Sequence, residues 1–263
     1  MQLKNKTLLR PVLLGPVLLG PILYSLIFLS SVSPQTTLAN DALLFSEASI
    51  TYQRGNNYKV GDEKQKISTF EHLSVWSWGD SFFFYDNLQE VASNHSSYYA
   101  ELAPRISLGN VTGESFAFGP VSDVLIASTF ERGSDGFDAW LLGLGLNWNM
   151  PGFSHFSSNI YYRDTDDVAG HTWQASLVWN MPFKIAGLDF LFDGYTDIRG
   201  NEGSSKSDFN FNPQLKLDVG KIFGYPKLLY SGIEYSHWHN KFGIDGVDER
   251  NLSGLLQMRF SFR

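Results

Sequence analysis

Apolar and polar residues alternate along most of the chain after residue 40, and residues 140–150, "WLLGLGLNWNM", show the pattern clearly. One set of alternate positions reads Trp140, Leu142, Leu144, Leu146, Trp148, Met150, and the other reads Leu141, Gly143, Gly145, Asn147, Asn149. Successive side chains of a β-strand point to opposite faces, so this pattern predicts a strand with one apolar face. The apolar run is too short to cross a membrane as a helix.

The same alternation recurs between clusters of Gly, Asn, Asp, Pro and Ser, and convincing helical periodicity is absent. Short alternating runs bounded by turn residues are typical of strands. The pattern predicts an all-β chain of about twelve strands, each of about ten residues, a length that suits a membrane-spanning strand. The predicted strands lie near 43–53, 66–77, 81–87, 97–108, 121–131, 137–149, 154–163, 171–181, 187–197, 207–218, 227–239 and 251–262.

Two all-β architectures fit this alternation: a soluble sandwich with apolar residues inward, and a membrane barrel with apolar residues facing lipid. The tryptophans favour the barrel. Trp140 and Trp148 share one face, about 26 Å apart at ~3.3 Å per residue. In a tilted strand, this separation is close to that of the two aromatic girdles of a membrane barrel. Trp173 and Trp179 repeat the pattern.

The connections and the end of the chain also favour a barrel. Longer polar links, such as "RGNNYKVGDEKQK" and "NKFGIDGVDER", alternate with shorter ones, such as "WGD" and "MPG". "GSDG" and "GNVTGESFAFGP" depart from this order. Long external loops and short periplasmic turns give such an alternation, and the chain ends in alternating Phe260 and Phe262. We predict a transmembrane up-and-down antiparallel β-barrel, multi-pass in a Gram-negative outer membrane, with local bulges at Pro104 and Pro213.

Residues 1–39 differ from the rest of the chain. Lys4, Lys6 and Arg10 precede the apolar run 11–29, and the segment ends in the small-residue stretch 37–39. This order of charge, apolar core and small residues is typical of a secretory signal peptide. An uncleaved membrane anchor is the alternative, although the prolines and glycines in the run disfavour a stable helix. We expect cleavage near residue 39, which leaves 40–263 as the barrel.

The composition excludes several classes of protein. The sequence has 263 residues, no cysteine and a formal net charge of −7. Without cysteine there is neither a disulfide framework nor a thiolate metal site, and an acidic exported chain is poorly suited to bind nucleic acid. His237 and His239 share a strand face but lack an obvious third ligand. The sequence therefore predicts no metal and no cofactor, and it predicts the lipid bilayer and lipopolysaccharide as partners.

An enzyme is the main rival of another class, because some outer-membrane barrels are lipases or proteases. Nucleophilic catalysis needs a serine, a histidine and an orienting group within hydrogen-bond reach. His171 and Ser176 are close in sequence, but their spacing places them on opposite faces of a strand. No GxSxG motif is present. The sequence therefore predicts no catalytic residues.

If the apolar faces meet lipid, the opposite faces line a lumen. A barrel of eight strands is filled by its own side chains and one of sixteen holds a wide channel, so twelve strands suit a narrow pore. The predicted inward positions carry more acids than bases, which disfavours a pore for phosphates. Aromatic planes among amides and carboxylates suit a neutral solute with a flat ring and several hydroxyls. The alternative for any one charged residue is a purely structural ion pair.

Four stretches resemble the nucleoside-specific outer-membrane channel family, the Tsx-like proteins with their OmpK-type relatives. They are "TFEHLSVWSWGDSFFFYD" (69–86), "YAELAPRISL" (99–108), "FGPVSDVLIAS" (118–128) and "GIEYSHWHNKFGIDG" (232–246). The resemblance implies a monomeric barrel that lets nucleosides diffuse across the outer membrane and binds them along the channel through aromatic and ionisable residues. It also implies that bacteriophages can use the external loops as a receptor.

The candidate solute-binding residues combine the family motifs with the inward-facing alternation. The motif positions are Glu71, Phe82, Phe84, Asp86, Tyr99, Glu101, Arg105, Glu234 and Trp238, and alternation alone adds Arg163, Asp189, Asp193, Gln214 and Lys216. We predict a passive channel selective for nucleosides and similar small neutral solutes. A general small-solute pore and a receptor or structural barrel with little transport are the alternatives.

Overall fold

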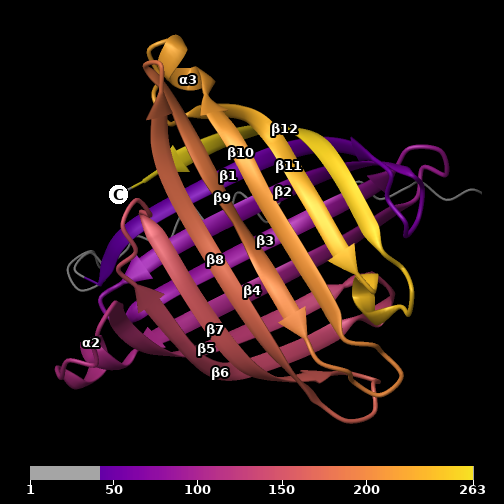
Figure 1. The fold of residues 1–263 in the computed structure, drawn as a ribbon, viewed down its shortest axis with the longest axis horizontal. Coiled ribbons are helices and arrows are strands. Elements are labelled where there is room, and N and C mark those ends of the chain that lie inside the picture. Colours follow the sequence, from indigo (N-terminus) through magenta and orange to yellow (C-terminus); the bar gives the residue numbers. More distant parts are fainter. Residues whose placement is uncertain (1–41, 263) are drawn as a thin grey trace, which may run out of the picture. The chain divides into compact units, whose positions relative to one another are not determined.

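The computed structural model describes residues 42–262, and these form a closed barrel of twelve strands. Each strand pairs antiparallel with its neighbours in sequence, and β1 closes the barrel on β12 (Figure 1). The predicted fold is confirmed, while the predicted signal peptide lies outside the described residues. The strands are β1 (Leu43–Asn56), β2 (Lys64–Trp76), β3 (Gly79–Glu90), β4 (Ser96–Ser107), β5 (Val121–Gly133), β6 (Asp138–Trp148), β7 (His155–Thr165), β8 (Thr172–Ile185), β9 (Leu188–Arg199), β10 (Asp208–Asp218), β11 (Leu229–His239) and β12 (Glu249–Ser261).

The barrel is apolar outside and polar inside. On β6, Leu142 and Leu144 are 51% and 54% exposed, whereas Leu141 between them is 2% exposed. Polar side chains such as Lys216 and Gln257 are buried on the inward face. This arrangement is that of a barrel whose outer surface meets lipid, where closure satisfies every backbone group. Among the described residues, no helix is long and apolar enough to cross a membrane.

The connections differ from the prediction. At the terminal end, where β1 begins and β12 ends, the connections 108–120 and 219–228 carry the short helices α2 (Leu108–Thr112) and α3 (Val219–Ile222). At the distal end, the connections 57–63, 91–95, 134–137, 166–171, 200–207 and 240–248 are mostly no longer than these. The predicted short turns at the terminal end are confirmed at 77–78, 149–154 and 186–187, and the prediction was wrong at 219–228. The distal connections are shorter than predicted, because several strands extend into segments that were predicted as loops.

The prediction of bulges at Pro104 and Pro213 was also wrong. Pairing between β4 and β5 is interrupted after Leu102↔Phe130 and resumes at Arg105↔Ala127 in the same register. The β10–β11 ladder is likewise interrupted at Pro213 and resumes unshifted. A proline removes one backbone donor from a ladder, and here that loss leaves a gap in pairing without inserting a residue.

Trp179 faces outward, as predicted, but it is only 6% exposed. Its ring lies against Phe192 and Phe211, with ring centroids 6.0 and 5.8 Å apart. Gly194, directly opposite Trp179 in the β8–β9 pair, has no side chain to hold the indole away from the wall. Trp179 is thus part of an aromatic cluster on the outer wall, and its neighbours cover it.

Two strand glycines differ sharply in the space around them. A Cβ on Gly143 would lie 1.8 Å from the Ile160 carbonyl oxygen, whereas nothing lies within 4 Å of a Cβ on Gly254. We expect Gly143→Ala to lower the free energy of unfolding by about 1–3 kcal/mol, because the backbone of β6 or β7 must shift. Urea unfolding followed by tryptophan fluorescence measures the loss, with Gly254→Ala as the control. Equal stabilities of the two variants would contradict the close approach of Gly143 to the Ile160 carbonyl group.

Candidate solute site on the inward face

The strand register places all of the predicted solute-binding residues on the inward face. In one row Thr69, Asp86 and Tyr99 lie opposite one another on β2, β3 and β4, and in the next row Glu71, Phe84 and Glu101 do so. The inward face of β9–β11 carries others in the same way, as with Asp193↔Gln214↔Glu234. The remaining members on this face are Phe82, Arg105, Arg163, Asp189, Lys216 and Trp238.

A row of aromatic rings follows the inward side of β3 and β4. Ring centroids are 6.0 Å apart for Phe82–Phe84, 5.8 Å for Phe84–Tyr99 and 6.1 Å for Tyr99–Phe137. These spacings are those of interacting aromatic pairs. Because Phe84 lies between Glu71 and Glu101 in register, the row combines flat apolar surfaces with carboxylates on both sides. The β2–β4 cluster consists of Glu71, Phe82, Phe84, Asp86, Tyr99 and Glu101.

The carboxylates of the β2–β4 cluster are held by neutral donors. Thr69 Oγ1 donates to Asp86 Oδ1 at 2.6 Å, and the Tyr99 hydroxyl donates to Glu101 Oε1 at 2.7 Å. The Ser49 hydroxyl and the Gln257 amide both donate to Glu71. Among residues 42–262, no Lys, Arg or His nitrogen lies within 4.0 Å of these three carboxylates. They therefore keep lone pairs for further donors.

A second inward network centres on Lys216. Its Nζ pairs with Asp193 Oδ2 at 2.7 Å and donates to Gln214 Oε1 at 2.9 Å and Gln257 Oε1 at 3.1 Å. Gln214 in turn donates to Glu234 Oε2 at 2.7 Å. Lys216 is therefore saturated with acceptors, whereas Glu234 receives only amide donors.

The inward arginines form closed ion pairs. Arg105 binds Asp80 through two hydrogen bonds of 2.8 and 2.7 Å, and Arg163 binds Glu131 through two of 2.6 and 2.7 Å. Bidentate pairs of this kind are strong and directional. Arg105 and Arg163 lie on the predicted face, but most of their donors are occupied by wall residues.

Two of the predicted residues lie at the ends of the barrel. Asp189, near the terminal end, pairs with Lys221 at 2.7 Å and with Lys184 at 3.6 Å, outside the main inward clusters. Trp238 lies at the distal end, where its ring centroid is 5.2 Å from that of Phe242. The structure therefore does not bring Asp189 together with the β2–β4 cluster.

The interior beside β8 and β9 is not filled by side chains. Val178 and Tyr195 face each other across the inward side of this strand pair, yet they are 37% and 38% exposed. The Tyr195 hydroxyl accepts hydrogen bonds from Asn210 at 3.2 Å and Asn212 at 2.9 Å, which confirms its inward direction. An inward side chain with this much accessible surface requires open space inside the barrel.

Two distal connections fold against the barrel mouth. Tyr58, in connection 57–63, is buried and shares a hydrogen bond of 3.1 Å with Ser253. Lys241, in the 3₁₀ turn η3 (Lys241–Gly243), donates to Glu249 Oε1 at 2.6 Å. The Lys241 ammonium also lies 5.5 Å from the Tyr58 ring centroid and 5.6 Å from that of Trp238, within cation–π range. Burial lowers the pKa of Lys241, and the Glu249 carboxylate opposes that shift.

Burial raises the pKa of Tyr58 to about 12, against the lowering effect of the Ser253 hydrogen bond. Because the folded pKa lies above the ordinary value of 10.0, the stability from the neutral phenol is present below pH ~10 and is lost as the pH rises through about 12. We expect the difference in tyrosinate absorbance at alkaline pH between the parent and Tyr58→Phe to show one ionisation near 12. An ionisation near 10 would contradict the burial of this side chain.

The predicted solute-binding set does not include several polar residues that the structure places on the inward face or at the barrel mouth. Asp197 shares the alternation of Asp189 and Asp193 and could have been found from it, and Ser176 donates to it at 2.5 Å. Asp80 and Arg199 lie where a turn and a loop were predicted, so the alternation was not extended to them. Lys241 carried a motif signal in the fourth stretch, but nothing in the sequence placed its ammonium against Tyr58.

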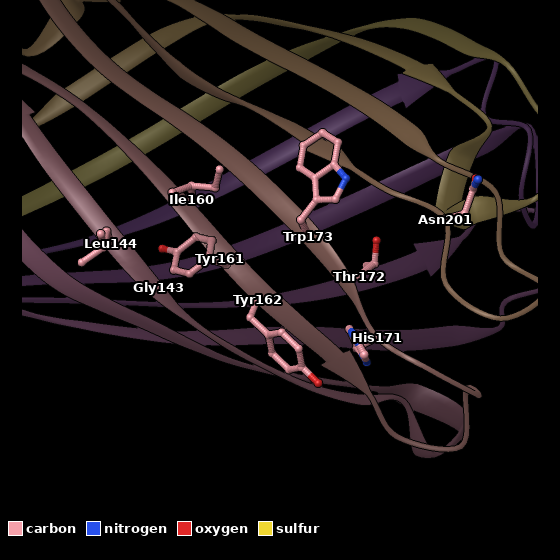
Figure 2. Close-up of a pocket in the computed structure, with 9 residues that line it drawn as sticks. All are labelled: Gly143, Leu144, Ile160, Tyr161, Tyr162, His171, Thr172, Trp173 and Asn201. Atoms are coloured by element: carbon pink, nitrogen blue, oxygen red, sulfur yellow. The ribbon is translucent and has the colours of Figure 1, made fainter.

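A separate hollow lies on the outer wall rather than inside the barrel. Figure 2 shows its lining on β6–β8, with Leu144, Ile160, Tyr162 and Trp173 on the outward face and His171 near the distal end. These outward side chains are exposed on the face that meets lipid. The hollow is therefore not part of a path for a solute through the barrel.

Residues 47–253 match the family described as nucleoside-specific channel-forming protein, Tsx. The chain belongs to this family. It is similar to the outer membrane protein OmpK of Vibrio parahaemolyticus, with 23% identity over 197 residues, which cover 72% of this chain and 74% of that relative. A second Vibrio parahaemolyticus OmpK is 27% identical over 161 residues, which cover 52% of this chain and 60% of that relative.

Among solved structures, the NanC porin has a TM-score of 0.50 and 10% sequence identity, and the match covers 81% of this chain and 98% of that one. This likeness concerns the fold alone. Family membership, the OmpK relatives and the inside-out barrel identify the chain as a multi-pass channel of the Gram-negative outer membrane.

Proposed function

We propose that this channel lets nucleosides and similar small neutral solutes diffuse passively across the outer membrane. The observation that carries the proposal is the β2–β4 cluster, where an aromatic row lies in register with carboxylates that have only neutral donors. A flat base can stack on Phe82, Phe84 or Tyr99. The hydroxyls of a sugar are donors that match the free lone pairs of Glu71, Asp86 and Glu101.

Residues elsewhere on the inward face would extend this path. Gln214, Glu234 and Asp193 offer amide and carboxylate groups on the β9–β11 side. Lys216 binds Asp193 and Gln214, and Gln214 donates to Glu234. Trp238 provides an aromatic plane at the distal mouth. Several weak sites in series allow a solute to enter without being trapped, as conduction requires. Arg105 and Arg163 would act by fixing the wall, since each is held in a bidentate pair, by Asp80 and by Glu131.

The charge of the cluster sets the expected selectivity. Inward carboxylates without cationic partners repel a phosphate, so a nucleoside is expected to enter much faster than its monophosphate. We expect proteoliposomes holding the refolded chain to take up adenosine at least about 10-fold faster than adenosine monophosphate. Equal rates would contradict the proposal. Equal uptake of adenosine and a sugar of similar size would favour a general small-solute pore.

A further inference from the structure

A group of basic side chains lies on the outward face near the distal end of β11, β12, β1 and β2. We call it the basic band, and it consists of Arg54, Lys64, Lys66, His237 and Arg250. Arg54 and Lys66 are directly opposite each other in the β1–β2 pair. Arg250 is directly opposite His237, and its Nε donates to His237 Nδ1 at 3.2 Å. Arg54, Lys64 and Arg250 are exposed.

The basic band borders the apolar belt of the barrel. Two positions from Arg54 toward the terminal end lies Tyr52, 47% exposed, and two positions from Arg250 lies Leu252, 55% exposed. Phe70, on the strand of Lys66, is 41% exposed. The cationic side chains therefore stand where the apolar surface ends, at the depth at which membrane lipids place their headgroups.

The cations of the basic band lack acidic partners. Within residues 42–262, neither Arg54, Lys64, Lys66 nor Arg250 forms an ion pair with Asp or Glu. Three acids of the adjoining connections are engaged elsewhere: Asp62 accepts from the Ala92 and Ser93 amides, Asp248 from His239 and Asn240, and Asp245 pairs with Lys206 at 3.9 Å. Glu63, next to Lys64 in sequence, forms no ion pair within residues 42–262.

The opposite wall differs at the same end. There Trp140, Tyr162 and Trp173 are exposed, and the outward Arg132 is paired with Asp138 at 2.8 Å. Among residues 42–262, the outward strand cations without an acidic partner at the distal end thus lie in one sector of the barrel. Like charges directly opposite on neighbouring strands destabilise a sheet. An anion from outside the chain would relieve the repulsion between Arg54 and Lys66.

We propose that the basic band binds the phosphate groups of lipopolysaccharide, with the acyl chains of the lipid lying on the apolar belt below. The terminal end carries the two-residue turns 77–78 and 186–187. Short turns face the periplasm in outer-membrane barrels, so the distal end and its basic band lie in the outer leaflet. Lipopolysaccharide carries its phosphates between its acyl chains and its sugars, at the depth of the basic band. Arginine and lysine are suited to phosphate oxygens through charge-assisted hydrogen bonds.

The test compares the full barrel, refolded in detergent, with Arg54→Gln/Lys66→Gln/Arg250→Gln. Titration with purified lipopolysaccharide, read by native mass spectrometry, is expected to show at least about a 10-fold loss of affinity in this variant. The charge-matched control, Arg132→Gln/Lys184→Gln/Lys206→Gln, is expected to bind as the parent does. Single-channel conductance of each variant reports folding independently, and Lys66→Gln alone replaces the triple variant if that one does not fold.

Titrations with two other lipids test whether the phosphates of lipopolysaccharide are what the basic band binds. Dephosphorylated lipopolysaccharide is expected to bind the parent at least about 10-fold more weakly, and so is phosphatidylglycerol, which has a single phosphate. Unchanged affinity in the triple variant, or equal binding of phosphatidylglycerol and lipopolysaccharide, would overturn the proposal. Neither result bears on solute selectivity, which depends on the inward face.

Discussion

Phe84→Ala is expected to raise the nucleoside concentration for half-maximal block of the channel current by about 10-fold. Stacking of a base on an aromatic side chain contributes ~1–3 kcal/mol, and Phe84 is the central ring of the inward row, between Phe82 and Tyr99. The expected change lies in solute affinity, because Phe84 is only partly buried and makes fewer packing contacts than a core side chain. Current block in planar bilayers measures it.

The neighbouring residue provides the control for this prediction. Phe83 follows Phe84 on the same strand but points outward, where its ring lies 6.2 Å from Phe70. Phe83→Ala removes an equal side chain from the lipid face, so block by nucleosides should be unchanged. If both variants blocked like the parent, stacking on the β2–β4 cluster would not be the basis of solute binding.

Arg163→Met is expected to lower the free energy of unfolding by about 3–5 kcal/mol, the usual loss when one partner of a buried ion pair is removed. The side chains of Arg163 and Glu131 are each 4% exposed. Glu101 lies directly opposite Glu131 on β4, so the substitution would leave two carboxylates facing each other without the bidentate arginine. Urea unfolding in liposomes, followed by tryptophan fluorescence, measures the loss.

Two variants separate this effect from a general loss of charge. Arg163→Met/Glu131→Gln is expected to be more stable than Arg163→Met, because it also removes the buried Glu131 carboxylate that would lack its arginine partner. Arg132→Met breaks the Arg132–Asp138 pair, in which the arginine side chain is 71% exposed, and should change stability by less than about 1 kcal/mol. Similar losses in Arg163→Met and Arg132→Met would show that burial of the first pair contributes nothing.

The faces of the strands could be predicted from the sequence because a side-chain period of two needs only local information. The alternation around Leu141, Leu142 and Gly143 was enough to say which residues meet lipid. For the same reason all of the predicted solute-binding residues lie on the inward face. The number and order of the strands followed from the turn residues between the alternating runs.

The partners of these residues could not be predicted, because they depend on register around the whole barrel. Gln53 donates to Glu234 at 2.6 Å although the two are far apart in sequence, and Arg163 reaches Glu131 across the intervening β6. Only the register shows that Arg163 is paired with Glu131, whereas Glu101 has no cationic partner among the described residues and keeps free lone pairs. This distinction separates wall residues from candidate solute contacts.

The connections were the least predictable part. Arg199 and Glu90 were expected in loops but belong to β9 and β3, because a strand can extend past the membrane as long as its neighbour continues the ladder. The position of Lys241 against Tyr58 and Glu249 depends on two connections far apart in sequence. No local pattern carries that information.

The most direct test of a nucleoside-selective channel is single-channel conductance of the refolded chain in a planar bilayer, titrated with adenosine, thymidine and a sugar of similar size. A nucleoside-selective channel should give a measurable current, with saturable block by both nucleosides and no block by the sugar. Equal block by all three solutes, or a current that none of them reduces, would contradict nucleoside selectivity. Absence of current from a folded barrel would contradict the channel itself.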